Sequence, residues 1–248
     1  MADAAAPGRF NTGRAVRRAL AMLKRNIAAN LAWAVVFTGL PDLAMAYANQ
    51  RFSEDAPFGS LARWGFLVGT MLASMFGMTA LQAVIARRTA LDDSNRRASS
   101  RSVFGGSSDY LALATLGLVT GLGIVAGYAL LAIPGIILSL AWFVVVPAMV
   151  TERLGVMESI RRSNALTREV RGEIFGLWVG VGILSFLAAW VGGLAIDALG
   201  IPALSLVVSS AIQAVIGLVD AILVVAVYQE LRESQEGSPA DRLVEVFA

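Results

Sequence analysis

Six long apolar stretches constrain the fold of this chain more than any other feature of its sequence. Each approaches the roughly 20 residues that a helix needs to cross about 30 Å of hydrocarbon. They produce a composition of 57% hydrophobic and 15% charged residues, against roughly 45–50% and about 25% in soluble domains. We therefore predict an all-α polytopic membrane protein. The predicted transmembrane helices cover residues 28–48, 65–86, 109–131, 135–151, 174–198 and 204–229.

The third and fourth stretches are expected to form a tight hairpin. Only the segment Ala132-Ile133-Pro134-Gly135 separates them, and the fourth stretch is short. Proline has no backbone N–H and cannot continue the preceding helix. A helix break is therefore predicted at this segment.

Lysine and arginine are concentrated in alternate connecting segments. Residues 1–27 contain six of them, residues 87–108 five, residues 152–173 five and the C-terminal segment two, which makes 18 of the 20 in the chain. Positive loops are retained in the cytoplasm, so we predict that both termini are cytoplasmic. The chain is expected to divide into a basic amphipathic segment (1–27), a transmembrane domain (28–229) and an acidic cytoplasmic tail (230–248).

Neither cysteine nor histidine occurs in the chain. Their absence excludes disulfides, thiolate chemistry, Ser-His-Asp triads and the usual zinc sites. No phosphate-cradling or dinucleotide-binding glycine motif is present either. We predict that the protein is not an enzyme and uses no cofactor. The pI near 9.4 is attributed to the arginines that set topology, so nucleic acid is not expected as a partner.

Residues 13–27 have the pattern of an amphipathic helix that lies in the membrane interface. Cations, among them Arg17 and Arg18, occupy positions between apolar residues at helical spacing. The apolar residues are Val16, Leu20, Leu23 and Ile27. Each cation near anionic headgroups contributes about 1 kcal/mol. The alternative is that these cations serve only to set the topology.

A weak internal repeat relates this segment to a second basic segment. Residues 16–24 resemble residues 160–168 (offset 144), and each copy precedes a helical hairpin. Guanidinium groups suit bidentate contacts with phosphate, so arginines of both copies are predicted to contact anionic phospholipid. The predicted lipid-binding residues are Arg17, Arg18, Arg161, Arg162 and Arg168.

Polar residues also occur within the apolar stretches. In the sixth stretch they share one helical face, formed by Ser209, Gln213, Gly217 and Asp220. An ionised carboxylate near the middle of a membrane helix is costly unless it is paired or hydrated. Asp220 is interpreted either as a proton or cation site or as a hydrogen-bonded structural contact with Gln213 or a neighbouring helix. In the first stretch Asp42 follows Pro41, which is expected to free a carbonyl and kink the helix.

Small residues recur at every fourth position in several stretches, as in Gly65-Gly69-Ala73-Gly77 and Gly176-Gly180. This spacing lets helix backbones approach closely in a membrane. It predicts packing inside a bundle or a dimer rather than the lining of a pore.

One run of residues carries a family resemblance. The run consists of Pro134-Gly135-Ile136-Ile137, Trp142, Pro147, Glu152, Glu158-Ser159-Ile160-Arg161-Arg162-Ser163 and Leu166-Thr167-Arg168. It resembles the membrane domain attached to some glycerophosphoryl diester phosphodiesterases, and the segment Tyr228-Gln229-Glu230-Leu231-Arg232 is similar to the end of that domain. The resemblance implies a stand-alone module of the bacterial inner membrane that lacks the phosphodiesterase's catalytic barrel.

The functional prediction from the sequence is non-catalytic. The protein is expected to engage anionic phospholipid, in the organisation of envelope lipids or as a membrane scaffold. Further expected partners are a second copy of the chain or another membrane protein. The alternative is a small transporter or permease-like component in which Asp220 and Gln213 line a polar path.

Overall fold

All elements in the described part of the chain are helices. The computed structural model describes residues 10–25, 27–55, 61–93, 107–199 and 202–236. The elements are α1 (Thr12–Arg25), α2 (Ile27–Ala34), the π-helical turn η1 (Val35–Gly39), α3 (Leu40–Asp55), α4 (Leu61–Asp93), α6 (Ser107–Leu130), α7 (Ala132–Ala141), α8 (Val145–Glu152), α9 (Val156–Thr167), α10 (Arg171–Leu199) and α11 (Pro202–Glu236). The predicted all-α fold is confirmed for these residues.

Six helical segments in the described residues are long and apolar enough to cross a membrane. They are Ile27–Gln50, Arg63–Asp92, Tyr110–Leu130, Ala132–Glu152, Arg171–Leu194 and Leu204–Glu236. Each coincides with one of the predicted stretches, so the predicted number and placement of membrane-length helices are confirmed. The fold is that expected of a multi-pass membrane protein.

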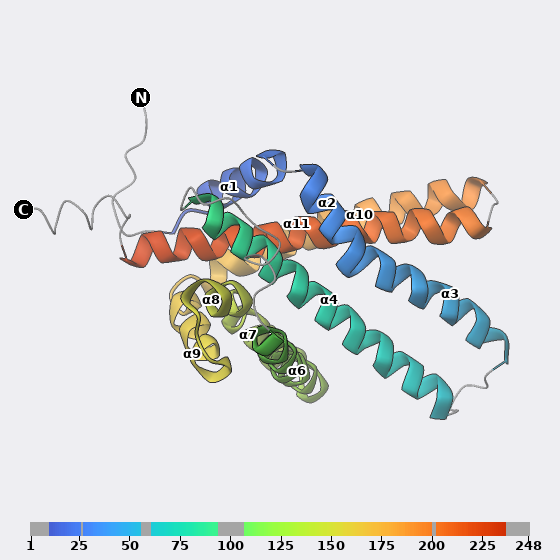
Figure 1. The fold of residues 1–248 in the computed structure, drawn as a ribbon, viewed down its shortest axis with the longest axis horizontal. Coiled ribbons are helices and arrows are strands. Elements are labelled where there is room, and N and C mark those ends of the chain that lie inside the picture. The colour runs from blue at the N-terminus through green and yellow to red at the C-terminus, as the bar shows by residue number, and fades with distance from the viewer. Residues whose placement is uncertain (1–9, 26, 56–60, 94–106, 200–201, 237–248) are drawn as a thin grey trace, which may run out of the picture.

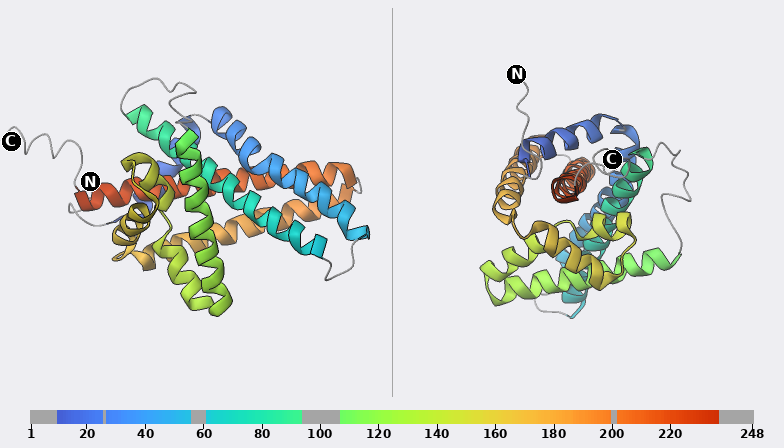
Figure 2. Two further views of the ribbon diagram at one scale, coloured as in Figure 1. Left: turned by 60° about the horizontal axis from the view of Figure 1, so that its bottom comes forward. Right: turned by 90° about the vertical axis from the view of Figure 1, so that its left-hand side faces the viewer.

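Three helical hairpins diverge from one end of the molecule (Figures 1 and 2). The first hairpin consists of α2, η1 and α3 followed by α4, the second of α6 and α7, and the third of α10 and α11. The left view of Figure 2 shows that the second hairpin points in a different direction from the third. The end from which they diverge contains α1, α9 and the last turns of α11, and we call it the basic end.

Helix α11 is the centre of the fold. It contacts α1, α2, η1, α3, α4, α8, α9 and α10, and the right view of Figure 2 shows it end-on among other helices. In its most apolar window 56% of the residues are buried, against 11% in the corresponding window of α10. Helix α10 therefore presents most of its apolar surface outward, as expected for a helix that faces lipid.

The fourth predicted stretch is divided into two helices. Leu131 is extended, and α7 begins directly after it, so that Pro134 lies in the first helical turn, where a missing N–H costs little. A turn over residues 142–144 then separates α7 from α8. The buried hydroxyl of Ser163 on α9 donates to the carbonyl of Ala141 at 2.9 Å, which satisfies a backbone group at this break.

The first membrane-length segment changes its helical hydrogen bonding just before Pro41. Across the π-helical turn η1, the N–H of Leu40 donates to the carbonyl of Val35, five residues earlier. Pro41 has no N–H to offer the carbonyl of Phe37, which would be its α-helical acceptor. A Cβ on Gly77 of α4 would lie only 2.0 Å from that carbonyl oxygen. The glycine therefore allows α4 to approach the modified turn closely.

The small-residue prediction is confirmed for some positions and not for others. A Cβ would clash with a neighbouring segment at Gly77, Gly121, Gly123, Gly127 and Gly192. Nothing lies within 4 Å of such a Cβ at Gly65, Gly69, Gly176 and Gly180. Among the described residues the first set mediates close packing, and the second set does not.

Candidate functional site

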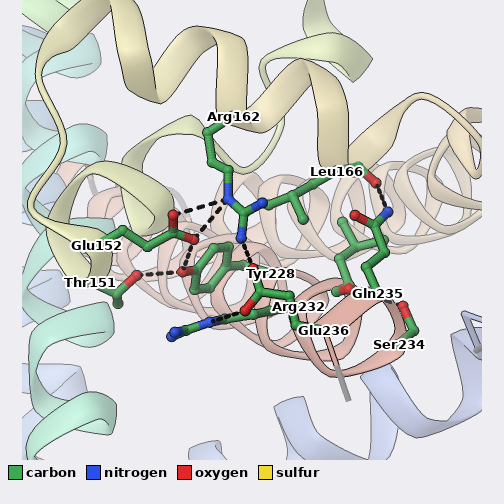
Figure 3. A network of polar contacts seen from close by, with 10 residues as sticks. Thr151, Glu152, Arg162, Leu166, Tyr228, Arg232, Ser234, Gln235 and Glu236 are labelled. Carbon is green, nitrogen blue, oxygen red and sulfur yellow. Dashed lines mark hydrogen bonds and ion pairs between the residues drawn. The ribbon is translucent and has the colours of Figure 1, made fainter. Parts of the chain in front are cut away.

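The basic end is organised around the last three turns of α11. Tyr228 is buried at 2% exposure, and its hydroxyl donates to Oε1 of Glu152 on α8 at 2.9 Å. The same hydroxyl oxygen lies 2.6 Å from Oγ1 of Thr151. Two turns further along α11, the side-chain amide of Gln235 donates to the carbonyl of Leu166 on α9 at 2.9 Å. These contacts join α8, α9 and α11 (Figure 3).

Arg162 is the central cation of this network. Its Nε donates to both carboxylate oxygens of Glu152, at 3.0 and 2.9 Å, and its Nη2 pairs with Glu236. Arg232 approaches the other oxygen of Glu236 at 3.2 Å. Burial lowers the pKa of Arg162, but the hydrogen bonds and charges of Glu236 and Glu152 outweigh that effect and raise it above its ordinary value. The side chain is therefore a permanent cation held within the protein.

A second set of ion pairs joins α1 to α11. Glu230 is buried at 1% exposure, and its Oε1 accepts a hydrogen bond from Nε of Arg14 at 2.7 Å. Its Oε2 has no hydrogen-bond partner among the described residues, but lies 3.7 Å from Nη2 of Arg18. Arg18 also pairs with Glu233. Together with the burial of Ala15 in the core, these pairs attach α1 firmly to the bundle.

The internal repeat has a structural counterpart. Arg18 of α1 and Arg162 of α9, which correspond in the repeat, both pair with glutamates of α11. The glutamates are Glu230, Glu233 and Glu236, and we call them the α11 glutamates. Equivalent positions are also exposed in both copies, namely Arg17 with Arg161 and Lys24 with Arg168. One helix end thus binds both basic segments.

The five predicted lipid-binding arginines fall into two groups. Arg18 and Arg162 are engaged in the ion pairs described above. The other three are exposed and make no ion pair with another residue in the described ranges; they are Arg17, Arg161 and Arg168.

The exposed arginines lie beside exposed apolar side chains. On α9, Met157 is 62% exposed, and helical spacing places it on the same face as Arg161, Asn164 and Arg168. We call these four residues the α9 outer face. On α1, Val16 and Leu20 are exposed next to Arg17. Both helices therefore present cations and apolar groups outward while their opposite sides pack on the protein.

The predicted polar face of the sixth stretch does not form a hydrogen-bonded cluster. The hydroxyl of Ser209 donates to the carbonyl of Leu206 on its own helix at 3.0 Å. Gln213 is exposed and Asp220 is partly exposed, and neither makes a hydrogen bond with another described residue. The suggested contact between Gln213 and Asp220 is therefore absent from this part of the structure.

Asp42 has a partner that the sequence did not indicate. It accepts a hydrogen bond from the hydroxyl of Ser210 on α11 at 2.9 Å, and Ser210 is buried at 4% exposure. Nearby, Thr38 packs against Gly217. A Cβ on Gly217 would lie 3.2 Å from Oγ1 of Thr38. A polar seam thus joins the first hairpin to α11, and it passes through Ser210 rather than Ser209.

The α11 glutamates are not among the predicted site residues, because the sequence predicts a separate tail over residues 230–248. Residues 230–236 instead continue α11, and residues 237–248 lie outside the described residues. Two signals were available in the sequence. No glycine or proline interrupts the helix before Gly237, and the three glutamates recur at three-residue spacing, which places them on neighbouring faces of one helix end.

Comparison with known proteins identified no relative of this chain. No family model, curated protein or solved structure matches the chain. The resemblance of residues 134–168 to a phosphodiesterase membrane domain therefore stays a prediction. In the structure, polar residues of that stretch bind one another or the adjoining backbone, as Arg162 binds Glu152 and Ser163 binds Ala141. Within the described residues, no group of three acidic side chains converges to hold a metal ion.

Proposed function

We propose that this protein is a non-catalytic, multi-pass protein of the bacterial inner membrane that engages anionic phospholipid at its basic end. The proposal rests on one observation. The repeat places a paired arginine and an exposed arginine side by side in each basic helix, as Arg162 and Arg161 in α9. The paired arginines hold the helices against α11, and the exposed ones are available to phosphate groups.

The surroundings of the exposed arginines favour a membrane surface over a soluble anion. Met157 on α9 and Leu20 on α1 are 62% and 51% exposed, and both lie beside cations. A helix with adjacent apolar and basic residues is suited to the boundary between headgroups and acyl chains. Because 18 of the 20 lysines and arginines lie in residues 1–27, 87–108 and 152–173 and in the C-terminal segment, we place the basic end, with both termini, in the cytoplasm.

The test is the lipid that co-purifies with the protein in mild detergent. Native mass spectrometry and lipid analysis would compare the wild type with Arg161→Ala/Arg168→Ala. We expect anionic phospholipid to be enriched with the wild type and affinity to fall about fivefold per arginine removed, from about 1 kcal/mol each. The matched control is Arg161→Lys/Arg168→Lys, which keeps both charges and should retain the lipid.

Unchanged lipid enrichment in the alanine variant would reject the proposal and leave the exposed arginines as topology signals only. Arg162 is left intact in this test because its loss would disturb the ion pairs with Glu152 and Glu236. The transporter alternative stays a prediction: Gln213 and Asp220 form no hydrogen bond with each other or with other described residues, and groups that line a hydrated path need none.

A further inference from the structure

A pocket at the basic end is lined by arginines from two different helices. It lies between the junction of α1 with α2 and the last turns of α4. Its polar lining residues are Arg25, Asn30, Arg88, Thr89 and Asp92. None of them belongs to the α9 outer face or to the α11 network, and none is Val16, Arg17 or Leu20 of α1. The pocket is therefore a separate feature of the molecule.

The charges that line the pocket are incompletely compensated. Nε of Arg25 lies 3.7 Å from Oδ2 of Asp92, a distance too long for a hydrogen bond. Arg88 makes no ion pair with another described residue. Two cations and one carboxylate leave the lining with a net positive charge. A phosphodiester, which carries one negative charge, would neutralise it.

Asn30 adds a buried amide to the same pocket. It is 7% exposed, and its Nδ2 reaches the carbonyl of Met22 only at 3.5 Å, at the long limit for a hydrogen bond. A buried amide with such a weak contact gains from a nearby acceptor. The apolar walls of the pocket are Met22 and Ile85, which would lie beside the less polar part of a bound headgroup.

The pocket lies at the ends of two membrane-length helical segments. One membrane-length segment begins at Ile27, and the neighbouring one ends at Asp92. The pocket lies where these two segments end, which is where the phosphates of a bilayer are found. Basic pockets between membrane helices on the cytoplasmic side are typical binding places for anionic headgroups.

We propose that this pocket binds the phosphate group of a phospholipid headgroup, with Arg25 and Arg88 as the cationic contacts and Asn30 as a hydrogen-bond donor. The inference rests on the proposed function in that the protein lies in a membrane and meets phospholipid. It differs in using a recessed site and other residues. Asp92 competes with the lipid phosphate for Arg25 and so limits the affinity.

The experiment is a titration of phosphatidylglycerol into the delipidated, detergent-purified full chain, with bound lipid resolved by native mass spectrometry. We expect Arg25→Ala and Arg88→Ala each to weaken the tightest lipid-binding event about fivefold. Arg153→Ala removes an exposed cation that does not line the pocket and should leave this event unchanged. Equal affinity in the wild type and both pocket variants would overturn the proposal.

Asp92→Asn tests the same site in the opposite direction. Removing the carboxylate that faces Arg25 should tighten phosphatidylglycerol binding, a gain that a misfolded variant would not show. Weaker binding by this variant would contradict the assigned role of Asp92. In a parallel arm, inorganic phosphate and glycerol 3-phosphate are added as competitors, and we expect them not to displace the lipid. Displacement would overturn the lipid assignment in favour of a soluble phosphate.

Separate variants distinguish this inference from the proposed function. The loss of lipid in Arg161→Ala/Arg168→Ala but not in Arg88→Ala would support the outer-face proposal and reject the pocket. The reverse pattern would support the pocket and reject the outer faces. The two sets of residues share no side chain, so one result does not determine the other.

Discussion

Arg162 donates from Nε to both carboxylate oxygens of Glu152, at 3.0 and 2.9 Å, and thereby joins α9 to the end of α8. Arg161, the preceding residue, is exposed and makes no ion pair within the described ranges. Two adjacent arginines of the same helix thus have different physical roles. Substitutions of paired and of exposed residues should therefore have different effects on stability.

Replacement of Arg162 should destabilise the protein, and replacement of Arg161 should not. Arg162→Ala leaves Glu152 and Glu236 without their guanidinium partner. Because these side chains are only partly exposed, at 28%, 17% and 27%, the cost should lie between those of exposed and buried ion pairs, at about 1–3 kcal/mol. Thermal unfolding in detergent would measure it. An equal effect of Arg161→Ala would show that the network is not the cause.

The contact between η1 and α4 predicts a strong effect of Gly77→Ala. The new methyl group would meet the backbone carbonyl of Phe37 at 2.0 Å, so the helices would have to separate at a cost of about 1–3 kcal/mol. Gly69→Ala on the same helix is the control, since nothing lies within 4 Å of its Cβ. We expect this control to unfold at or above the wild-type temperature. A lower unfolding temperature for Gly69→Ala than for Gly77→Ala would contradict the close packing of α4 on η1.

The polar seam predicts that two adjacent serines differ in importance. Ser210→Ala removes the hydroxyl that donates to Asp42 and should destabilise the protein by about 1–3 kcal/mol, because an acceptor loses its partner. Ser209→Ala removes only a contact with its own helix backbone and should have a smaller effect. Chemical unfolding of both variants checks the order. A larger loss of stability in Ser209→Ala than in Ser210→Ala would contradict the assignment of the polar seam to the Ser210 face of α11.

The orientation can be tested by cysteine labelling, because the chain contains no cysteine of its own. Ala165→Cys places a thiol at an exposed position on α9, and Leu61→Cys places one at a 91% exposed position near the opposite ends of the hairpins. In intact cells, a membrane-impermeant maleimide should label Leu61→Cys alone. In permeabilised cells the maleimide should label both variants. Labelling of Ala165→Cys in intact cells would invert the proposed topology.

Asp220→Asn distinguishes the proposed function from transport. Asp220 has no hydrogen-bond partner among the described residues, and an ionisable group within a membrane helix is costly. We therefore expect the variant to fold, to remain at least as stable as the wild type and to keep its bound phospholipid. Proton and cation flux would be compared in vesicles that contain either protein. A flux present in the wild type and lost in the variant would favour the transporter.

The helices could be predicted from the sequence, whereas their internal breaks were only partly predictable. The length of an apolar stretch is a local property, and it places every membrane-length helix correctly. Pro134 marks the start of α7 for an equally local reason. The turn over residues 142–144 contains neither glycine nor proline. It depends on contacts such as that of Ser163 with Ala141, which no local pattern reveals.

The sequence by itself determined the all-α class, the number and placement of the membrane-length helices and the existence of two related basic segments, whereas the orientation stays a prediction. Each of these follows from the composition and from the spacing of residues along the chain. Tertiary structure alone decided which arginines are paired and which are exposed, and which serine meets Asp42. The physical reason is rotation: neighbouring residues on a helix point about 100° apart, so their environments depend on which face packs against α11.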